Sequence, residues 1–146
     1  MSDFAAVEIT ADDTHELRLE VLRNDTPTAT VKFPEDDLPG TFHLGIRDAD
    51  GHIVAISTWV PRPFRDEPAV QLRGMATAPR VQGHGAGATL LEAGCSRATA
   101  TAALVWARAR DTALAFYLRH DFVVDGDGFI DDQTLKPHHF IIRRLP

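Results

Sequence analysis

Short runs rich in apolar residues, separated by polar turn sequences, predict several strands in the first half of the chain. Such runs, bounded by turn residues, are typical of strands. They occupy residues 7–9, 41–47, 52–59 and 69–77. An Asp-Ala-Asp-Gly sequence separates the second run from the third, and its last residue, Gly51, suits the positive φ of a hairpin turn. We therefore expect antiparallel neighbours in this region.

Apolar residues spaced three and four apart predict three helices. Asp12 or Thr14 provides a cap for the first helix, which continues to about Arg23. The second helix spans residues 85–99, and the third spans residues 112–120.

The second half of the chain continues the sheet. Residues 102–107 are too apolar for a strand exposed on both faces, residues 122–124 begin another strand, and residues 140–143 form a closing strand after a turn at 125–128. A helix between two buried strands is typical of a parallel crossover. The order predicts an α+β fold with one mixed sheet of about six to seven strands, flanked by helices, in a single domain over residues 1–146.

Composition and charge restrict the classes of function. Hydrophobic residues make up 44% of the 146 residues, and no apolar run approaches the ~20 residues of a membrane span. Residues 1–4 lack a secretory signal pattern, and the single Cys95 excludes an internal disulfide, so we expect a cytoplasmic protein without a membrane partner. The net charge of −6 argues against nucleic-acid binding and is compatible with a cationic amine as substrate.

A polar, proline-rich connection spans residues 24–40 and is long for a compact domain, so we expect a functional loop or a short helix within it. It contains the acidic run Glu35-Asp36-Asp37. Such a run is most often a solvated loop. Alternatively, it lines the mouth of a site and attracts a cation.

Residues 75–91 are the most informative segment. An apolar run ends at Thr77, three alternating glycines follow at Gly83, Gly85 and Gly87, and a helical pattern begins there. Backbone N–H groups of such a turn point the same way, with the positive end of a helix dipole behind them. The segment is therefore predicted to hold an anionic group, most often a phosphate.

Three phosphate-binding motifs compete for this turn. A P-loop requires a lysine, and none lies near residue 88; a dinucleotide fold requires Gly-x-Gly-x-x-Gly near the start of a βαβ series. The third motif is Arg/Gln-x-x-Gly-x-Gly/Ala after the fourth strand. Residues 80–85, Arg-Val-Gln-Gly-His-Gly, fit it.

With this motif the chain resembles the GCN5-related N-acetyltransferase (GNAT) superfamily. The strand at 71–76, the strand and helix at 106–117 with its Phe-Tyr pair, and the closing Pro-His strand at 136–144 are also similar to that family. The segment at 39–45 resembles a small-molecule branch. The resemblance covers residues 5–145.

The resemblance implies acetyl-CoA as cosubstrate. Its pyrophosphate is expected on the N–H groups of residues 82–87, and its pantetheine arm beside the strand at 75–77. A backbone N–H near Met75 or Ala76 is expected to face the thioester oxygen. The expected cofactor-binding residues are Met75, Ala76, Thr77, Arg80, Val81, Gln82, Gly83, His84, Gly85, Ala86, Gly87, Arg108 and Phe116.

Tyr117 is the first catalytic candidate, because the resemblance implies a tyrosine here that donates a proton to the departing sulfur. Alternatively, Tyr117 is a core aromatic on an apolar helix face. The strand that often carries a glutamate base in the family has Gln71 and Arg73 instead.

The remaining candidates for the base are His138 and His139, of which strand alternation turns only one into the site. Glu67, Asp131 or a relayed water could assist. Alternatively, both histidines are ordinary strand residues.

The resemblance also has departures. Arg108 replaces an asparagine that often contacts the cofactor, and Asp121 stands where the family usually has glycine. We expect no metal site, because no two of the seven histidines share i, i+4 spacing on a helix, and we expect Cys95 to be buried and structural.

The predicted function is transfer of an acetyl group from acetyl-CoA to a primary amine, by direct attack in a ternary complex. The branch resemblance favours a small-molecule amine and is compatible with a homodimer. The alternative is a non-catalytic module of the same fold that binds an acyl-CoA. Another acyl donor also stays open.

Overall fold

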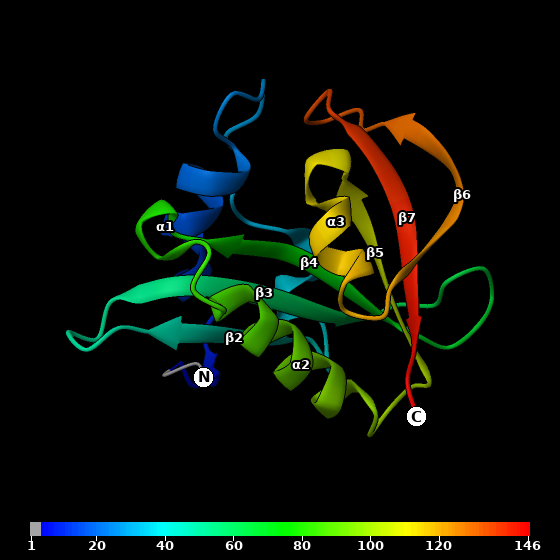
Figure 1. The fold of residues 1–146 in the computed structure, drawn as a ribbon, viewed down its shortest axis with the longest axis horizontal. Coiled ribbons are helices and arrows are strands. Elements are labelled where there is room, and N and C mark those ends of the chain that lie inside the picture. Colours follow the sequence, from blue (N-terminus) through cyan, green and yellow to red (C-terminus); the bar gives the residue numbers. More distant parts are fainter. Residues whose placement is uncertain (1–3) are drawn as a thin grey trace.

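The computed structural model describes residues 4–146; residues 1–3, which entered the expectation about a signal segment, lie outside the described residues. The chain forms one seven-stranded sheet with the order β1-β2-β3-β4-β5-β7-β6 (Figure 1). The strands are β1 (Val7–Ile9), β2 (Phe42–Arg47), β3 (Ile53–Pro61), β4 (Val70–Thr77), β5 (Leu104–Arg110), β6 (Val123–Ile130) and β7 (Pro137–Arg144).

The sheet is mixed, as predicted. Strands β1 to β4 pair antiparallel in sequence order, β4 and β5 are parallel, and β7 pairs antiparallel with both β5 and β6. The hairpin between β2 and β3 has its turn where the sequence placed it. Gly51 has a φ of +85°, and the Asp48 carboxylate accepts the N–H groups of Asp50 and His52.

Helices cover both faces of the sheet. The predicted first helix is one helical segment with changing hydrogen-bond spacing, consisting of η1 (Asp12–Thr14), α1 (His15–Leu17) and η2 (Arg18–Leu22). The other helical elements are η3 (Pro34–Asp37), η4 (Pro79–Val81), α2 (Ala86–Ala98), η5 (Asp111–Ala113) and α3 (Leu114–Leu118). No helix among residues 4–146 is long and apolar enough to span a membrane.

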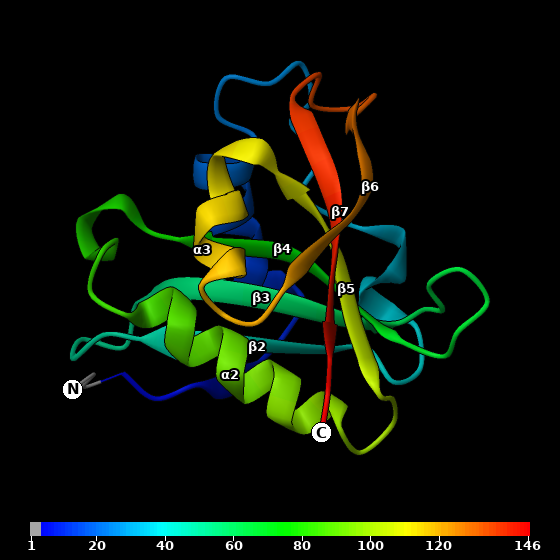
Figure 2. The ribbon, with the colours of Figure 1, turned by 45° about the vertical axis from the view of Figure 1, so that its right-hand side comes forward.

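Adjacent residues of β3 show which helices share a face. Trp59 packs against α2 at Gly94, whereas Thr58 accepts a hydrogen bond from Arg18 of η2. Since neighbouring side chains of a strand point to opposite faces, α2 and η2 lie on opposite sides of the sheet. Figures 1 and 2 draw α3 beside α2 on the same side.

A glycine sets the distance between α2 and the sheet. A Cβ atom on Gly94 would lie 1.8 Å from Cζ2 of Trp59, whose side chain is fully buried. Only glycine allows this approach, so the large indole fills the core directly beneath the helix axis.

Two predicted details of the second half were wrong. Residues 125–128, expected as a turn, belong to β6, because a register shift between Asp125 and Phe129 and the positive φ of Gly126 (+84°) absorb the extra residues as a bulge. The strand expected at 102–107 is β5, which begins two residues later and ends three residues later. Its last residues alternate alanine with arginine, so apolar content alone ended the predicted strand too early.

Candidate active site

The site begins where β4 and β5 separate. The two strands pair only at Val70–Val105 and Gln71–Trp106, although β4 remains paired with β3 up to Thr77. Gly74 supports the divergence, because its φ of +58° accompanies a register shift between β3 and β4. A cavity of about 770 Å³ fills the space that opens between β4 and β5.

One wall of the cavity, which we name the α3 side, consists of β4, the start of α2 and α3. Its residues include Met75, Thr77, Gln82, Gly87, Phe116 and Tyr117. The Gln82 amide donates to the Thr77 carbonyl at 3.0 Å. A Cβ atom on Gly87 would lie 3.3 Å from the Phe116 ring, so the absence of a side chain at this position lets the ring pack closely against the start of α2.

The glycine turn runs from Gln82 to Gly87, both of which line the cavity. Gly83 and Gly85 have φ values of +81° and +92°, in the region that side chains rarely adopt, and Gly85 caps the 13-residue helix α2. The turn therefore has the conformation that its alternating glycines predicted, at the N-terminus of a full helix.

The structure brings together only part of the predicted cofactor-binding set. Met75, Ala76, Thr77, Gln82, Gly87, Arg108 and Phe116 line the cavity. Arg80, Val81, Gly83, His84, Gly85 and Ala86 are outside its lining. Arg80 is exposed and pairs with Asp48 of the β2–β3 turn at 2.7 Å, and Val81 ends η4. The other four residues belong to the glycine turn. Their contact with acetyl-CoA stays a prediction.

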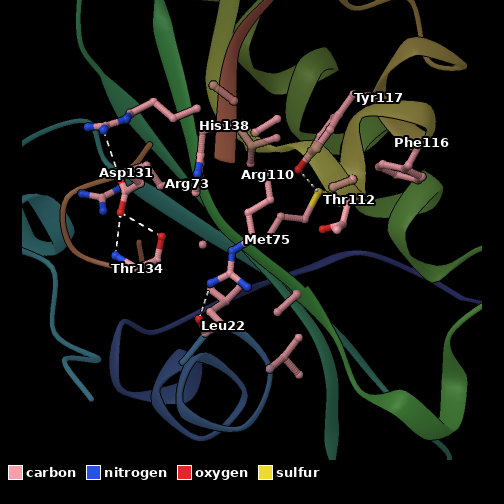
Figure 3. Close-up of a pocket in the computed structure, with 18 of the residues that line it drawn as sticks. Leu22, Arg73, Met75, Arg110, Thr112, Phe116, Tyr117, Asp131, Thr134 and His138 are labelled. Carbon is pink, nitrogen blue, oxygen red and sulfur yellow. Dashed lines mark hydrogen bonds and ion pairs between the residues drawn. The ribbon is translucent and has the colours of Figure 1, made fainter. Parts of the chain in front are cut away.

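Tyr117 reaches the cavity from α3 and is otherwise enclosed. Its hydroxyl donates to the Met75 sulfur at 3.7 Å (Figure 3). Phe116 and Phe122 pack edge-on against its ring. Burial raises the pKa of this phenol above its ordinary value of 10. The hydroxyl is therefore held as a proton donor that points towards a sulfur acceptor.

His138 lines the cavity and His139 does not, in agreement with strand alternation. Nδ1 of the buried His138 lies 2.8 Å from the Lys136 carbonyl, which can only accept, so Nδ1 carries a hydrogen. In the neutral imidazole the lone pair is then on Nε2. His139 is held at 2.6 Å from the Asp111 carboxylate.

The two carboxylates considered beside these histidines lie apart. Asp131 lines the cavity, whereas Glu67 forms an ion pair with Arg144 outside it.

The opposite wall, which we name the η2 side, consists of η2, β4, β5 and the loop between β6 and β7. Its side chains are unusually basic: Arg23, Arg62, Arg73, Arg108 and Arg110 line it, together with Asp131 and Asp132. Arg108 donates to Asp131 at 2.9 Å. The carboxylate expected on the fourth strand of the family is absent from this wall, because β4 presents Gln71 and Arg73 there.

The acidic run at 35–37 is not a solvated loop, because two of its three carboxylates are buried in ion pairs. Asp36 is buried and forms two hydrogen bonds with the fully buried Arg18, at 2.7 and 2.8 Å. Glu35 is buried and forms ion pairs with Arg73 and Arg62. Pairing inside the protein explains the difference, and Asp37 alone is exposed.

A buried polar network extends from this pair. Arg18 also donates to Thr58 at 2.8 Å, and the Thr58 hydroxyl lies 2.8 Å from Nδ1 of His43. Nε2 of His43 lies 3.2 Å from the Asp36 carbonyl, which closes the ring of contacts. This network fixes η2 and η3 on the sheet beside the cavity.

Sequence reasoning missed this network because its members are distant along the chain. One local signal pointed to it: Pro34 followed by an acidic residue at the third helical position is typical of a helix start. The Asp36 carboxylate indeed accepts the N–H of Phe33 at 3.0 Å.

Other chemistry-bearing groups have structural explanations. Burial raises the pKa of the Cys95 thiol to about 11, which opposes a role as nucleophile. Within residues 4–146, potential metal ligands gather at Asp48, Asp50 and His52. This exposed group is the β2–β3 turn, where Asp48 already binds Arg80 and two backbone amides.

Comparison with known proteins identifies the family. The model of the acetyltransferase (GNAT) family matches residues 8–122. YitI of Bacillus subtilis (strain 168), an uncharacterised N-acetyltransferase, is 31% identical over 125 residues, which cover 83% of each chain. The chain therefore belongs to the GNAT family of acetyltransferases and is an acetyl-transferring enzyme, and the family uses acetyl-CoA.

Solved structures show the same fold. ElaA of Escherichia coli superposes with a TM-score of 0.79 at 15% identity, covering 97% of this chain and 99% of that one. An acyl-CoA N-acyltransferase of Pseudomonas aeruginosa gives 0.77 at 22% identity, with 97% and 99% covered. A phosphinothricin acetyltransferase of Sinorhizobium meliloti in complex with AcCoA gives 0.72 at 18% identity, with 97% and 88% covered.

The Arg18–Asp36 pair gives a prediction about stability. Asp36→Asn leaves the buried Arg18 charge without a counter-ion and is expected to lower the free energy of unfolding by about 3–5 kcal/mol at neutral pH. Urea unfolding measures this. The neighbouring Asp37→Asn is the matched control, and its effect is expected to stay within about 0.5 kcal/mol because Asp37 is exposed.

The pH dependence of this loss follows from the Asp36 pKa. Burial alone would raise that pKa, but the bonds from Arg18 and the Phe33 N–H outweigh it, so the net pKa lies below 3.8. The stabilisation is complete above the unfolded pKa and disappears as the pH falls through the lowered folded pKa. The difference in free energy of unfolding between wild type and Asp36→Asn should become smaller below pH ~4. If this difference is absent at pH 7, or stays constant down to pH 3, the Arg18–Asp36 pair does not stabilise the fold as described.

Proposed function

We propose that this enzyme transfers the acetyl group of acetyl-CoA to the primary amine of a small molecule, by direct attack within a ternary complex. One observation carries the proposal: a single cavity in the β4–β5 gap has the Tyr117 hydroxyl on its α3 side and the His138 imidazole on its lining. A proton donor and a proton acceptor therefore share the space where two substrates can meet.

The residues present fit acetyl-CoA. The glycine turn provides backbone N–H groups at the N-terminus of α2 for the pyrophosphate, without side chains that would block its approach. Ala78 donates its N–H to β3, so strand alternation points the N–H of Thr77 to the other edge, towards the β4–β5 gap. That edge is available to the pantetheine amides. Acetyl-CoA, when bound, supplies an acetyl group activated as a thioester.

Tyr117 acts as general acid in this proposal. Its raised pKa keeps it protonated at neutral pH, and its hydroxyl already points to a sulfur atom in Met75. The same hydroxyl would donate a proton to the CoA sulfur as the carbon–sulfur bond breaks. A backbone N–H near Met75 or Ala76 would stabilise the negative charge on the thioester oxygen.

His138 acts as general base. Because the Lys136 carbonyl holds the proton on Nδ1, the Nε2 lone pair is available to accept a proton from the amine. The ammonium group loses two protons, one before the attack and one as the intermediate collapses, while a nitrogen–carbon bond replaces the sulfur–carbon bond. Sulfur gains one proton, and the other leaves to solvent through His138.

The Tyr117→Phe variant tests the acid. Without the hydroxyl, kcat for acetylation of an amine panel is expected to fall about 100-fold or more, while the KM for acetyl-CoA changes by less than about threefold. Leu118→Ala, at an exposed position of the same helix, is the control. Turnover that is indifferent to Tyr117→Phe contradicts the mechanism. If the wild-type chain binds CoA but acetylates no amine, a non-catalytic binding module is the better description.

The His138→Gln variant tests the base through its pH dependence. A lysine-like amine with a pKa of ~10.4 is almost wholly protonated at pH 7, so removal of the base is expected to lower kcat/KM about 100-fold there. The deficit should shrink as the pH approaches ~10, because the amine then loses its proton unaided. His139→Gln is the matched control. An equal deficit at every pH would show that His138 has only a structural role.

A further inference from the structure

The η2 side of the cavity carries more positive charge than the neighbouring carboxylates neutralise. Five arginines and two aspartates line the cavity, in a protein whose net charge is −6. Glu35, which lies behind this wall, neutralises part of the excess through its ion pairs with Arg73 and Arg62. Two net positive charges remain when Glu35 is counted with the lining.

Two of these arginines have no acidic partner. Arg23 donates to the Thr30 carbonyl at 2.7 Å, and Arg110 donates to the Leu22 carbonyl. Among the residues that the structure describes, neither has a carboxylate within 4.0 Å. A carbonyl satisfies one donor but leaves the charge unneutralised, and a guanidinium has five donors in a planar fork that matches a carboxylate or phosphate.

The positive charges of these arginines also repel one another, which destabilises the charged form of each. Burial, and then the positive charges of Arg18, Arg23 and Arg108, lower the pKa of Arg73 to about 10. Burial, and next the charge of Arg110, lower the pKa of Arg23. Asp131 opposes these effects but forms its ion pair with Arg108. Such a cluster gains when an anion enters it, because partly buried charges of one sign are costly without a counter-ion.

The geometry places this charge beside His138, the proposed base. Arg110 lies directly opposite His138 in the β5–β7 pairing, so both side chains project from the same face of the sheet. Arg23 approaches from η2 on that face, away from α2 and its glycine turn. Figure 3 shows Arg110 and Arg73 turned into the space between η2 and the loop that carries Asp131 and Thr134.

We propose that the acceptor is an amine that also bears an anionic group, a carboxylate or a phosphoryl group, which Arg23 and Arg110 bind while the amine faces His138. This proposal rests on the proposed function. It differs from the alternative, raised by the acidic run, that the mouth of the site attracts a cation. The acidic run is paired internally, and the cavity wall is basic.

The test compares amines that differ only in the anionic group. Initial rates with acetyl-CoA are measured for α- and ω-amino acids, for their carboxamides, and for aminoalkyl phosphonates. The wild-type enzyme is expected to prefer an anionic member over its matched amide by at least about tenfold in kcat/KM, the range of a charge-assisted hydrogen bond. Comparing the amino acids with the aminoalkyl phosphonates shows whether the enzyme prefers a carboxylate or a phosphoryl group.

Variants then assign the preference to the cluster. Arg110→Gln and, independently, Arg23→Gln are expected to lower the ratio of the two kcat/KM values about tenfold, with the acetyl-CoA KM little changed. The exposed Arg119→Gln, outside the cavity, should leave the ratio intact. Using two variants keeps the test informative if one of them fails to fold, as judged by circular dichroism.

The outcomes separate the two proposals. Acetylation of amides or uncharged amines as efficient as that of anionic amines overturns the anionic acceptor and leaves the acetyltransferase function standing. A loss of acetyl-CoA affinity in both variants, with the ratio unchanged, shows that the arginines serve the CoA phosphates and also overturns it. Acetylation of no amine at all refutes the proposed function itself.

Discussion

Strands β4 and β5 pair through Val70–Val105 and Gln71–Trp106 and then separate, and the rest of the site depends on that separation. A continuous parallel ladder would fill this part of the sheet with backbone hydrogen bonds. The gap instead leaves an edge of β4 exposed to the cavity. It also allows groups from both faces of the sheet, Tyr117 from α3 and Arg110 from β5, to reach one space.

Buried ion pairs stabilise the side of this gap that has no long helix. Arg18 and Asp36 join η2 to η3 across the face of β3, and Glu35 anchors Arg73 of β4. A buried charge without a partner lowers the stability of the fold. Arg23 and Arg110 have no carboxylate partner, and this absence is the basis for proposing an anionic ligand. A protein with a negative net charge thus has a basic cavity, so the net charge does not predict the charge of the site.

The fold and the α3 side of the site could be predicted because their signals are local. Glycines at 83 and 85 take positive φ in a strand–turn–helix, and alternation required that only one of His138 and His139 face the cavity. The structure shows that this residue is His138. The η2 side could not be predicted in the same way. Arg18 and Asp36 are eighteen residues apart in the sequence, and only the folded chain brings them into contact. Without knowledge of such partners, an acidic run is predicted to be solvated.

Hydrogen exchange at the Thr77 amide, with and without saturating acetyl-CoA, tests the central claim most directly. If the pantetheine arm lies against the open edge of β4, this amide gains a hydrogen bond, and its exchange should slow at least about tenfold, whereas the amide of Ala55 in β3 should change little. Unchanged exchange at Thr77, in an enzyme shown to be saturated with acetyl-CoA, would place the cosubstrate elsewhere and contradict the account.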